Sequence, residues 1–177
     1  MSNCVNCGAP VRIDQDGVAV CDHCGTRQDP SVSLQYVELQ NETGTMCPVC
    51  SAALSTATLG GHPLLCCARC YGMLLAMDLF ADIIDAVRLR EPRRLRTAPP
   101  LRGSPNDRII GCPSCHTPML AHLYAGPGNV VIDSCERCGV NWLDGGELRR
   151  IALSPDTVGR RRDDRSNADL EPAVDDE

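Results

Sequence analysis

Cysteines are the residues of this chain best suited to chemistry. The sequence of 177 residues contains 13 cysteines, and twelve of them form Cys-x-x-Cys pairs. The pairs fall into three groups, which are Cys4, Cys7, Cys21 and Cys24; Cys47, Cys50, Cys67 and Cys70; and Cys112, Cys115, Cys135 and Cys138. A Cys-x-x-Cys turn presents two thiolates to one ion, and a second turn completes a tetrahedron that suits zinc. The spacing therefore predicts three zinc ions, each held by four cysteines.

These sites are expected to be structural. Four thiolates fill the coordination shell of zinc and leave no position for water or substrate, which argues against catalytic or redox-sensing cysteines. Iron in a rubredoxin-like site is an alternative, because four thiolates suit it as well. Disulfides are a further alternative, but they need an oxidising compartment.

The sequence favours a soluble, cytoplasmic protein. It begins Met-Ser-Asn-Cys and shows no apolar signal segment. The longest apolar run, around Met73 to Met77, is too short to span a bilayer, and Asp78 ends it.

The remaining cysteine, Cys66, could replace Cys67 as a ligand, react as a free thiol or pack as a small apolar residue. We favour packing, because Cys67-x-x-Cys70 keeps the standard spacing. Histidines could also bind metal, but each group of four is complete without them. The chain has four, namely His23, His62, His116 and His122. His23 and His116 lie within or beside cysteine pairs and are expected to donate hydrogen bonds near the sites or to face solvent.

Aromatic residues make up only 3% of the chain, which leaves little material for a large core. Segments of about 30–45 residues rarely bury enough apolar surface to fold unaided, so metal binding must contribute folding free energy. We therefore predict a small metal-stabilised α+β protein of three tandem zinc ribbons, each a β-hairpin with two cysteine knuckles. The predicted units are ribbon 1 (1–30), a connector (31–45), ribbon 2 plus a helix (46–90), an Arg/Pro-rich linker (91–108), ribbon 3 plus a short helix (109–153) and a disordered acidic tail (154–177).

The first ribbon shows a hairpin pattern. Apolar residues alternate on both sides of an Asp/Gly turn at 14–17, which is typical of a β-hairpin. The alternating residues are Val11, Ile13, Val18 and Val20. Beyond this ribbon, residues 31–40 could form a strand ahead of a polar stretch.

The second and third ribbons are repeats of each other. Two alignments, of Cys47 with Cys112 and of Cys70 with Cys138, each bring further identical or similar residues together. The matched pairs are Pro48 and Pro113, Cys50 and Cys115, Leu75 and Leu143, Phe80 and Leu148, and Ile83 and Ile151. Each repeat is predicted to be two knuckles on a hairpin followed by a helix.

Apolar residues at helical spacing predict the helix of the second ribbon, from Met73 to Arg90. One face would carry Met73, Met77, Phe80, Ile84 and Val87. This face could pack on its own ribbon, or part of it could pair with another protein or a second copy.

A capping box predicts where the helix of the third ribbon begins. Asp144 is expected at the N-cap, where it can accept from a backbone N–H, and Glu147 is expected to reach back to the N–H of the cap residue. Leu148, Ile151 and Ala152 would then face the ribbon.

The third ribbon resembles the bacterial zinc ribbons named after the zinc finger of transcription factor IIB. The residues that carry the resemblance are Cys112-Pro-Ser-Cys115, Asp133-Ser-Cys135-Glu-Arg-Cys138-Gly139 and Trp142-Leu143-Asp144-Gly-Gly-Glu147-Leu148. Val140 replaces a second glycine that is usual after the last cysteine, and Asn141 is inserted before Trp142. The second ribbon is similar to a degenerate copy, with Leu74-Leu75 in place of Trp142-Leu143, and the first resembles only a generic zinc ribbon. The resemblance implies zinc binding and a transcription or nucleic-acid context.

The charge distribution leaves the class of partner open. The net charge is −6, and every fixed positive charge is an arginine. Each zinc held by four thiolates adds about −2, which opposes simple binding to nucleic acid. Arginines concentrated at 88–108 could nevertheless grip phosphates, or this segment could be a solvated linker. The candidate contacts are Arg88, Arg90, Arg93, Arg94, Arg96 and Arg102.

No catalytic triad, isolated carboxylate pair or nucleotide-binding loop is present in the sequence. We therefore predict a non-enzymatic docking or regulatory protein without a small-molecule substrate, whose partner is either the nucleic-acid machinery or another protein. A redox or zinc sensor using Cys66 is a third, more distant hypothesis. Trp142 could be a stacking platform for a base, but we favour a role as core anchor because aromatics dominate small cores.

Overall fold

The computed structural model describes residues 9, 11–13, 19–23, 25, 27–28, 36–90, 109–126 and 128–155. Near the N-terminus, β1 (Val11–Ile13), β2 (Ala19–Cys21) and β3 (Arg27–Gln28) form a three-stranded sheet in that order. β1 and β2 are antiparallel, with Val11 opposite Cys21, as expected of a hairpin around 14–17.

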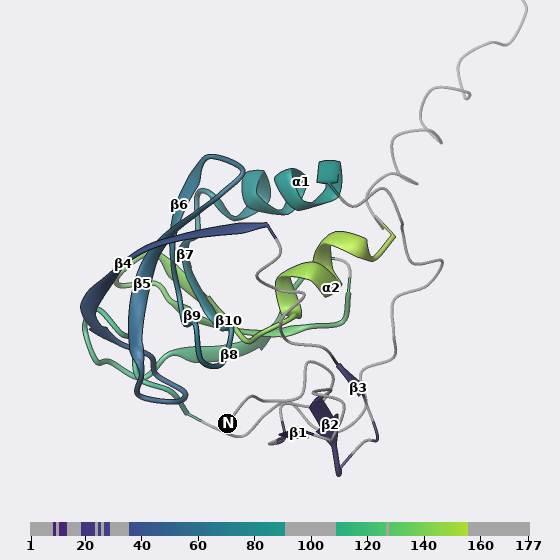
Figure 1. The fold of residues 1–177 in the computed structure, drawn as a ribbon, viewed down its shortest axis with the longest axis horizontal. Helices are drawn as coiled ribbons and strands as arrows, with labels where there is room; N and C mark the ends of the chain where they lie inside the picture. The colour runs from purple at the N-terminus through teal and green to yellow at the C-terminus, as the bar shows by residue number, and fades with distance from the viewer. Residues whose placement is uncertain are drawn as a thin grey trace, which may run out of the picture.

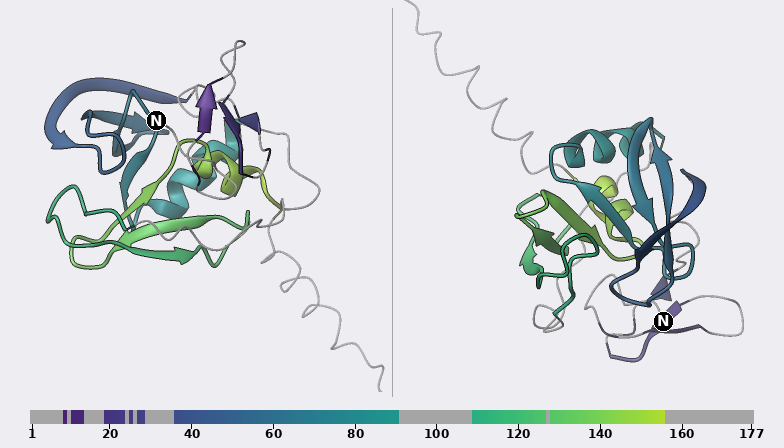
Figure 2. Two further views of the ribbon diagram at one scale, coloured as in Figure 1. Left: turned by 90° about the horizontal axis from the view of Figure 1, so that it is seen from below. Right: turned by 90° about the vertical axis from the view of Figure 1, so that its left-hand side faces the viewer.

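A seven-stranded antiparallel sheet organises the rest of the described chain (Figures 1 and 2). Its strands are β4 (Val37–Met46), β5 (Ala53–Leu59), β6 (His62–Cys66), β7 (Met73–Ala76), β8 (Leu120–Leu123), β9 (Val131–Cys135) and β10 (Val140–Leu143). They lie in the order β4-β5-β6-β7-β10-β9-β8. Two helices, α1 (Phe80–Arg90) and α2 (Glu147–Leu153), pack against the same core on one face of this sheet. Neither described helix is long and apolar enough to cross a membrane.

The second and third ribbons, which the sequence predicts to be separate modules, share this one sheet. β7, the last strand of the second ribbon, pairs with β10, the last strand of the third. Each of these strands would otherwise leave a row of backbone N–H and C=O groups at an exposed edge. Pairing satisfies both rows at once, and the two ribbons thereby become one folded unit.

The β7–β10 pairing relates the two repeats by a local two-fold axis. Leu74 lies opposite Trp142, and the alignment of Cys70 with Cys138 also matches Leu74 with Trp142. When two antiparallel strands place a residue opposite its own repeat equivalent, a two-fold axis must pass between them. The sheet therefore consists of two similar halves arranged around the Leu74–Trp142 pair.

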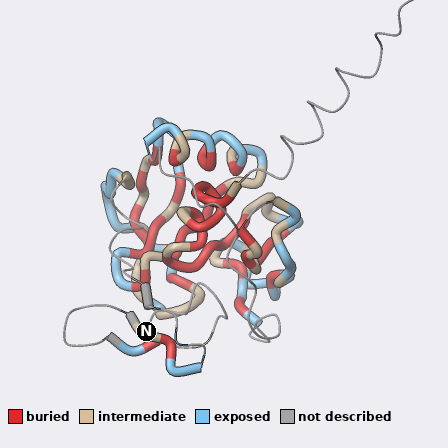
Figure 3. Tube along the Cα trace, turned by 90° about the vertical axis from the view of Figure 1, so that its right-hand side faces the viewer, coloured by how far each residue is buried: buried red, intermediate tan, exposed pale blue. Residues whose placement is uncertain are grey.

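Two apolar clusters cover the two faces of the sheet. The cluster beneath the helices includes Leu59, Leu75, Ile83 and Ile151, and the opposite one includes Leu54, Leu74, Trp142 and several cysteines. Alternate strand residues point to opposite faces, which explains why neighbours such as Leu74 and Leu75 belong to different clusters. Figure 3 shows the buried residues gathered in the central strands and on the inner sides of the helices.

The prediction of one helix from Met73 to Arg90 is wrong in its first part. Residues 73–76 form β7, and the helix begins only at Phe80. Met73, Leu74 and Leu75 are all buried because β7 is an inner strand with apolar material on both faces. Such a run lacks the alternation that marks a half-exposed strand, so it resembles a buried helical segment.

The second half of the predicted helix has the expected core face. Phe80, Ile84 and Val87 are buried within the cluster beneath the helices, together with Ile83. The ring centroid of Phe80 lies 5.2 Å from that of Tyr124, which comes from the third ribbon. This face of α1 is therefore covered by the protein's own core.

The region predicted as a connector, where residues 31–40 could form a strand, contains a strand that is longer and lies further along the chain. β4 pairs with β5 from Val37, opposite Leu59, to Met46, opposite Ala53, with two register shifts between. As the edge strand, β4 exposes most of its side chains, which is why the polar residues 41–44 can belong to it. Bulges and polar side chains are usual on edge strands.

Helix α2 uses one arm of the predicted capping box. The backbone N–H of Asp144 donates to Glu147 Oε2 at 2.7 Å, as expected. The N-cap itself is Gly146, with φ 94°, rather than Asp144. At the other end, Ser154 is the buried C-cap and its hydroxyl donates to the Arg150 carbonyl at 2.8 Å. Ser154, the first residue of the predicted tail (154–177), is therefore part of the cap of α2, and residues 156–177 lie outside the described residues.

Candidate metal centres

The second ribbon brings its four cysteines into one cluster, here called the Cys47 site. Their sulfur atoms all lie within 4.8 Å of one another. Cys47 Sγ is 3.5 Å from Cys70 Sγ, and Cys50 Sγ is 3.4 Å from Cys67 Sγ. A disulfide would need about 2.05 Å, whereas the edge of a tetrahedron with Zn–S bonds of roughly 2.3 Å is about 3.8 Å. The spacing therefore fits a tetrahedral ion and no disulfide.

The third ribbon forms a matching cluster, here called the Cys112 site, from Cys112, Cys115, Cys135 and Cys138. These sulfur atoms also lie within 4.8 Å of one another, and Cys115 Sγ is 3.7 Å from Cys135 Sγ. In each cluster two cysteines precede the hairpin and two lie at or after its end, with Cys135 as the last residue of β9. The prediction of four cysteines per site is confirmed for both ribbons.

Backbone hydrogen bonds shape each of three knuckles in the same way. The first cysteine of the knuckle donates its backbone N–H to the carbonyl oxygen five residues later. Its own carbonyl oxygen accepts from the backbone N–H four residues later. In the Cys47 knuckle these bonds are Cys47 N–H to the Ala52 carbonyl at 2.7 Å and Ser51 N–H to the Cys47 carbonyl at 3.0 Å. The same pair of bonds begins at Cys67 and at Cys112. Such turns direct both sulfur atoms of a pair toward one point.

The residue after each second cysteine adopts the left-handed backbone conformation. These residues are Ser51 (φ 57°), Tyr71 (φ 62°), His116 (φ 59°) and Gly139 (φ 63°). Only the last is a glycine, and other residues in this conformation cost of order 1–3 kcal/mol each. That strain persists only where the surrounding structure imposes it, as a shared metal ion would.

Within each cluster, neighbouring thiols shift the pKa of several cysteines. In the Cys47 site, hydrogen bonds with Cys47 and then Cys70 hold the pKa of Cys67 far below the ordinary cysteine value, whereas the thiols of Cys47 and Cys67 raise the pKa of Cys70. In the Cys112 site, the thiol of Cys115 is the main cause that raises the pKa of Cys138 to about 12. Four adjacent sulfurs cannot all become thiolates unless a cation neutralises them. A divalent ion such as Zn²⁺ meets that need.

Thr117 is a contributor to the Cys112 site that the spacing of the cysteines does not reveal. Its Oγ1 lies 3.2 Å from Cys115 Sγ. The hydroxyl, followed by the backbone N–H of the same residue, lowers the pKa of Cys115 to about 6. Thr117 therefore favours the thiolate form of Cys115, which binds metal. This role is evident only from the folded structure, which places the Thr117 hydroxyl beside Cys115.

Cys66 packs in the core and is not a ligand. It is fully buried beneath the helices, whereas Cys67 belongs to the cluster on the opposite face. The alternation of strand side chains separates these two neighbours. Burial is the main cause that raises the pKa of Cys66 to about 12, so the reactive thiolate that a sensor needs is disfavoured.

The histidines described by the structure lie outside both cysteine clusters. His23 and His116 are exposed, and His62 is half-buried. His122 forms a separate polar contact, with its Nε2 2.8 Å from Ser134 Oγ, whose hydroxyl donates to Asn141 Oδ1 at 2.7 Å. No described histidine is therefore part of a metal cluster.

The first predicted site stays a prediction. Cys4, Cys7 and Cys24 lie outside the described residues, and Cys21 is buried at the end of β2. Gly25 has φ 70° and donates its N–H to the Cys21 carbonyl at 2.8 Å, which matches one of the two hydrogen bonds of the knuckles above. The structure thus places two of the three expected metal sites.

Trp142 lies between the two metal sites and is fully buried. Its Nε1–H donates to Asp144 Oδ1 at 3.1 Å. The backbone three residues after Trp142 also approaches the other half, because a Cβ on Gly145 would stand 2.7 Å from the carbonyl oxygen of Cys70. Trp142 is therefore the core anchor favoured by the sequence, and its buried ring presents no surface for stacking on a base.

Two of the candidate nucleic-acid contacts are described. Arg88 is half-buried, with its Nε donating to the Ala152 carbonyl at 3.3 Å and its side chain 3.3 Å from Asp85 Oδ1. Arg90 is exposed at the end of α1. The other candidates, Arg93, Arg94, Arg96 and Arg102, lie outside the described residues.

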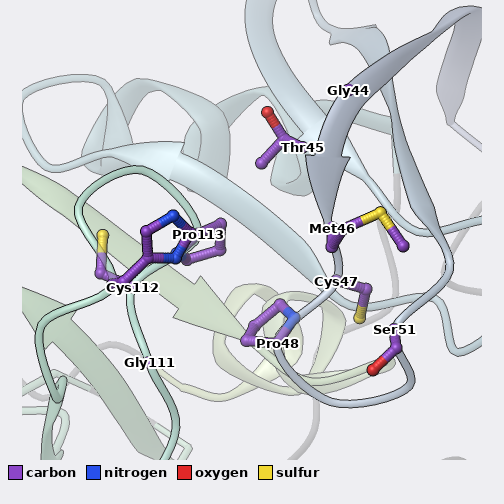
Figure 4. A pocket seen from close by; sticks show the side chains of 10 residues that line it. Gly44, Thr45, Met46, Cys47, Pro48, Ser51, Gly111, Cys112 and Pro113 are labelled. Atoms are coloured by element: carbon purple, nitrogen blue, oxygen red, sulfur yellow. The ribbon is translucent and has the colours of Figure 1, made fainter.

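A cleft separates the two metal sites at the surface, and we call it the inter-knuckle cleft (Figure 4). It has a volume of about 360 Å³. Four pairs of repeat-equivalent residues line it, namely Met46 and Gly111, Cys47 and Cys112, Pro48 and Pro113, and Ser51 and His116. Because both knuckles contribute the same positions, the cleft lies on the local two-fold axis that passes between Leu74 and Trp142.

Comparison with known proteins supports zinc binding by the third ribbon. A family model described as a transcription factor zinc-finger matches residues 111–154. This range contains all four cysteines of the Cys112 site as well as Trp142. No curated protein and no solved structure matches the chain.

Proposed function

We propose that this chain is a non-enzymatic docking module, in which structural zinc sites hold a rigid surface for a protein partner. The observation that carries the proposal is the closure of both metal sites. Each cluster already supplies four sulfur ligands, so a tetrahedral zinc ion would have no position left for water or substrate. Zinc in such a site stabilises the fold rather than performing catalysis.

The charge of the described chain favours a protein over nucleic acid. Residues 36–90 and 109–155 contain nine acidic side chains and six arginines, which gives −3. Two zinc ions, each with four thiolates, bring this to about −7. Phosphate binding depends on neutralisation by cationic side chains, and the buried Trp142 supplies no exposed stacking surface.

Nucleic-acid binding is the second candidate, and two observations favour it. One is the match of residues 111–154 to the transcription factor zinc-finger family. The other is the group of seven arginines between Arg88 and Arg108. A segment of this kind could hold phosphates even when the remaining protein is acidic.

Titration of the zinc-loaded protein against duplex and single-stranded DNA and RNA, at several salt concentrations, separates these candidates. The protein-docking proposal predicts no measurable binding at low salt. Binding that weakens steeply with salt and disappears when the arginines at 93, 94, 96 and 102 are changed to glutamine would instead establish the second candidate. Protein docking is then tested by affinity capture from the native cell after nuclease treatment, followed by reconstitution with the purified partner.

A further inference from the structure

We propose that the inter-knuckle cleft binds an arginine side chain presented by the protein partner. This inference rests on the proposed docking function and adds the chemistry that the partner must offer. Three properties of the cleft support it: its position between two metal sites, the composition of its walls and its size.

Position gives the cleft a negative potential. Cys47 and Cys112, which line it, are ligands of the two different sites, and each site with zinc carries about −2. None of the described lining residues is an arginine, aspartate or glutamate. The two knuckle arginines, Arg69 and Arg137, are exposed but do not belong to the lining. The cleft therefore attracts a cation and repels a phosphate.

The walls distinguish arginine from other cations. Met46, Pro48 and Pro113 offer apolar surface against which the aliphatic stem of an arginine can pack. The hydroxyls of Thr45 and Ser51 can accept hydrogen bonds from a guanidinium (Figure 4). The ammonium group of lysine is more strongly hydrated than a guanidinium and lacks its flat face. Lysine would therefore lose more hydration on entering the cleft and make fewer contacts there.

Size fits one inserted side chain. The volume of about 360 Å³ is at the lower end of the range of small-ligand sites, roughly 300–1,000 Å³. Met46, which is 53% exposed, ends the edge strand β4 and forms one wall. An extended peptide passing over this end of β4 could therefore place a single side chain between the knuckles.

The test uses the zinc-loaded full chain, labelled with ¹⁵N, and a capped Gly-Ser peptide with one central arginine. The probe should shift the amide signals of Thr45, Ser51, Gly111 and His116 in a saturable way. A peptide with citrulline, the neutral counterpart of arginine, should not do so. Raising the salt concentration should weaken the binding of the arginine peptide, because the attraction is electrostatic. Equal shifts with both peptides would overturn the proposal.

A matched pair of variants places the site. Thr45→Arg introduces a cation into the cleft and should lower the affinity for the arginine peptide about tenfold or more, because like charges oppose binding. Gln40→Arg adds the same charge to an exposed position of β4 outside the cleft and should leave most of the affinity. Zinc content and Trp142 fluorescence should be unchanged in both variants. Equal loss in both, or loss in neither, would show that the cleft is not the site.

Failure here is distinguishable from failure of docking itself. If a purified partner binds the wild-type chain and Thr45→Arg equally well, the chain is a docking module that uses another surface, and the cleft proposal is wrong. If nucleic acid binds and shifts the amide signals of the cleft, both proposals are wrong.

Discussion

The indole of Trp142 lies so close to Gly72 that a Cβ on this glycine would overlap the ring carbon Cζ2. Gly72 directly follows the second knuckle of the Cys47 site, and Trp142 belongs to the ribbon of the Cys112 site. The contact therefore joins the two halves of the sheet at their centre. A side chain at Gly72 would have to displace either a buried ring or a zinc knuckle.

Gly72→Ala is accordingly expected to destabilise the protein by about 1–3 kcal/mol, the usual cost of overpacking a well-packed core. Urea unfolding followed by circular dichroism measures the effect. Gly44→Ala is the control, because a Cβ at Gly44 would meet no atom within 4 Å and alanine suits a strand better than glycine. A Gly72→Ala variant as stable as Gly44→Ala would contradict the close contact.

Trp142 should report on a metal site that lies in the other ribbon. Cys67→Ala removes a ligand of the Cys47 site and is expected to reduce the zinc content by about one ion per chain. Since Trp142 packs against this knuckle and is the only tryptophan, its emission should shift toward that of an exposed indole. Metal analysis and fluorescence on the same samples provide the measurement.

Cys66→Ala is the matched control, since Cys66 is adjacent in sequence but buried on the opposite face. It should keep the full zinc content and the native emission, apart from the loss of stability expected of a truncated core side chain. If Cys66→Ala loses zinc and Cys67→Ala retains it, then Cys66 is the ligand and Cys67 is not, which contradicts the assignment made here.

Acid should release zinc from the Cys112 site at a higher pH when Thr117 is changed to valine. The Thr117 hydroxyl lowers the pKa of Cys115 to about 6, and a group with a lowered pKa keeps its stabilising effect until the pH falls through that value. Without the hydroxyl the pKa of Cys115 rises, so protons displace the metal earlier as the pH falls. A pH titration with a chromogenic zinc chelator follows the release.

Thr117→Ser retains the hydroxyl and should behave like the wild type. Identical release curves for the valine and serine variants would show that the hydroxyl does not stabilise the thiolate.

The cysteine spacing was sufficient to predict both described metal sites. The Cys-x-x-Cys spacing itself places two sulfur atoms around one ion. The alignment of the repeats also predicts a similar architecture for both ribbons. The packing of Cys66 in the core is also predictable, because the standard spacing assigns Cys67 to the knuckle.

The joining of the two ribbons could not be predicted in this way. It depends on β7 and β10, which are far apart in sequence and meet only in the folded chain. The sequence of β7 predicts a helix because its residues are apolar on both faces. The sequence predicts only the first part of β4, within residues 31–40, because an edge strand tolerates the polar residues that follow. Long-range strand pairing leaves no local pattern in either segment.

The capping arm at Glu147 was predicted from sequence, and its removal gives a separate test. Glu147→Ala deletes the acceptor of the Asp144 N–H and should cost about 0.5–2 kcal/mol, which is typical of a lost cap. Glu147→Gln keeps a side-chain oxygen and should cost less. Thermal unfolding of the three proteins compares them, and equal stability would contradict a role for this bond.

The central claim is that metal at the two described sites holds the shared sheet together. The most direct test removes the metal gradually with a strong chelator while zinc release and Trp142 emission are recorded together. If metal holds the sheet together, the chain contains at least two zinc ions at the start and loses its native emission as they are released. A chain that contains almost no metal when gently purified, or that keeps its native emission and circular dichroism after all zinc has left, would contradict it.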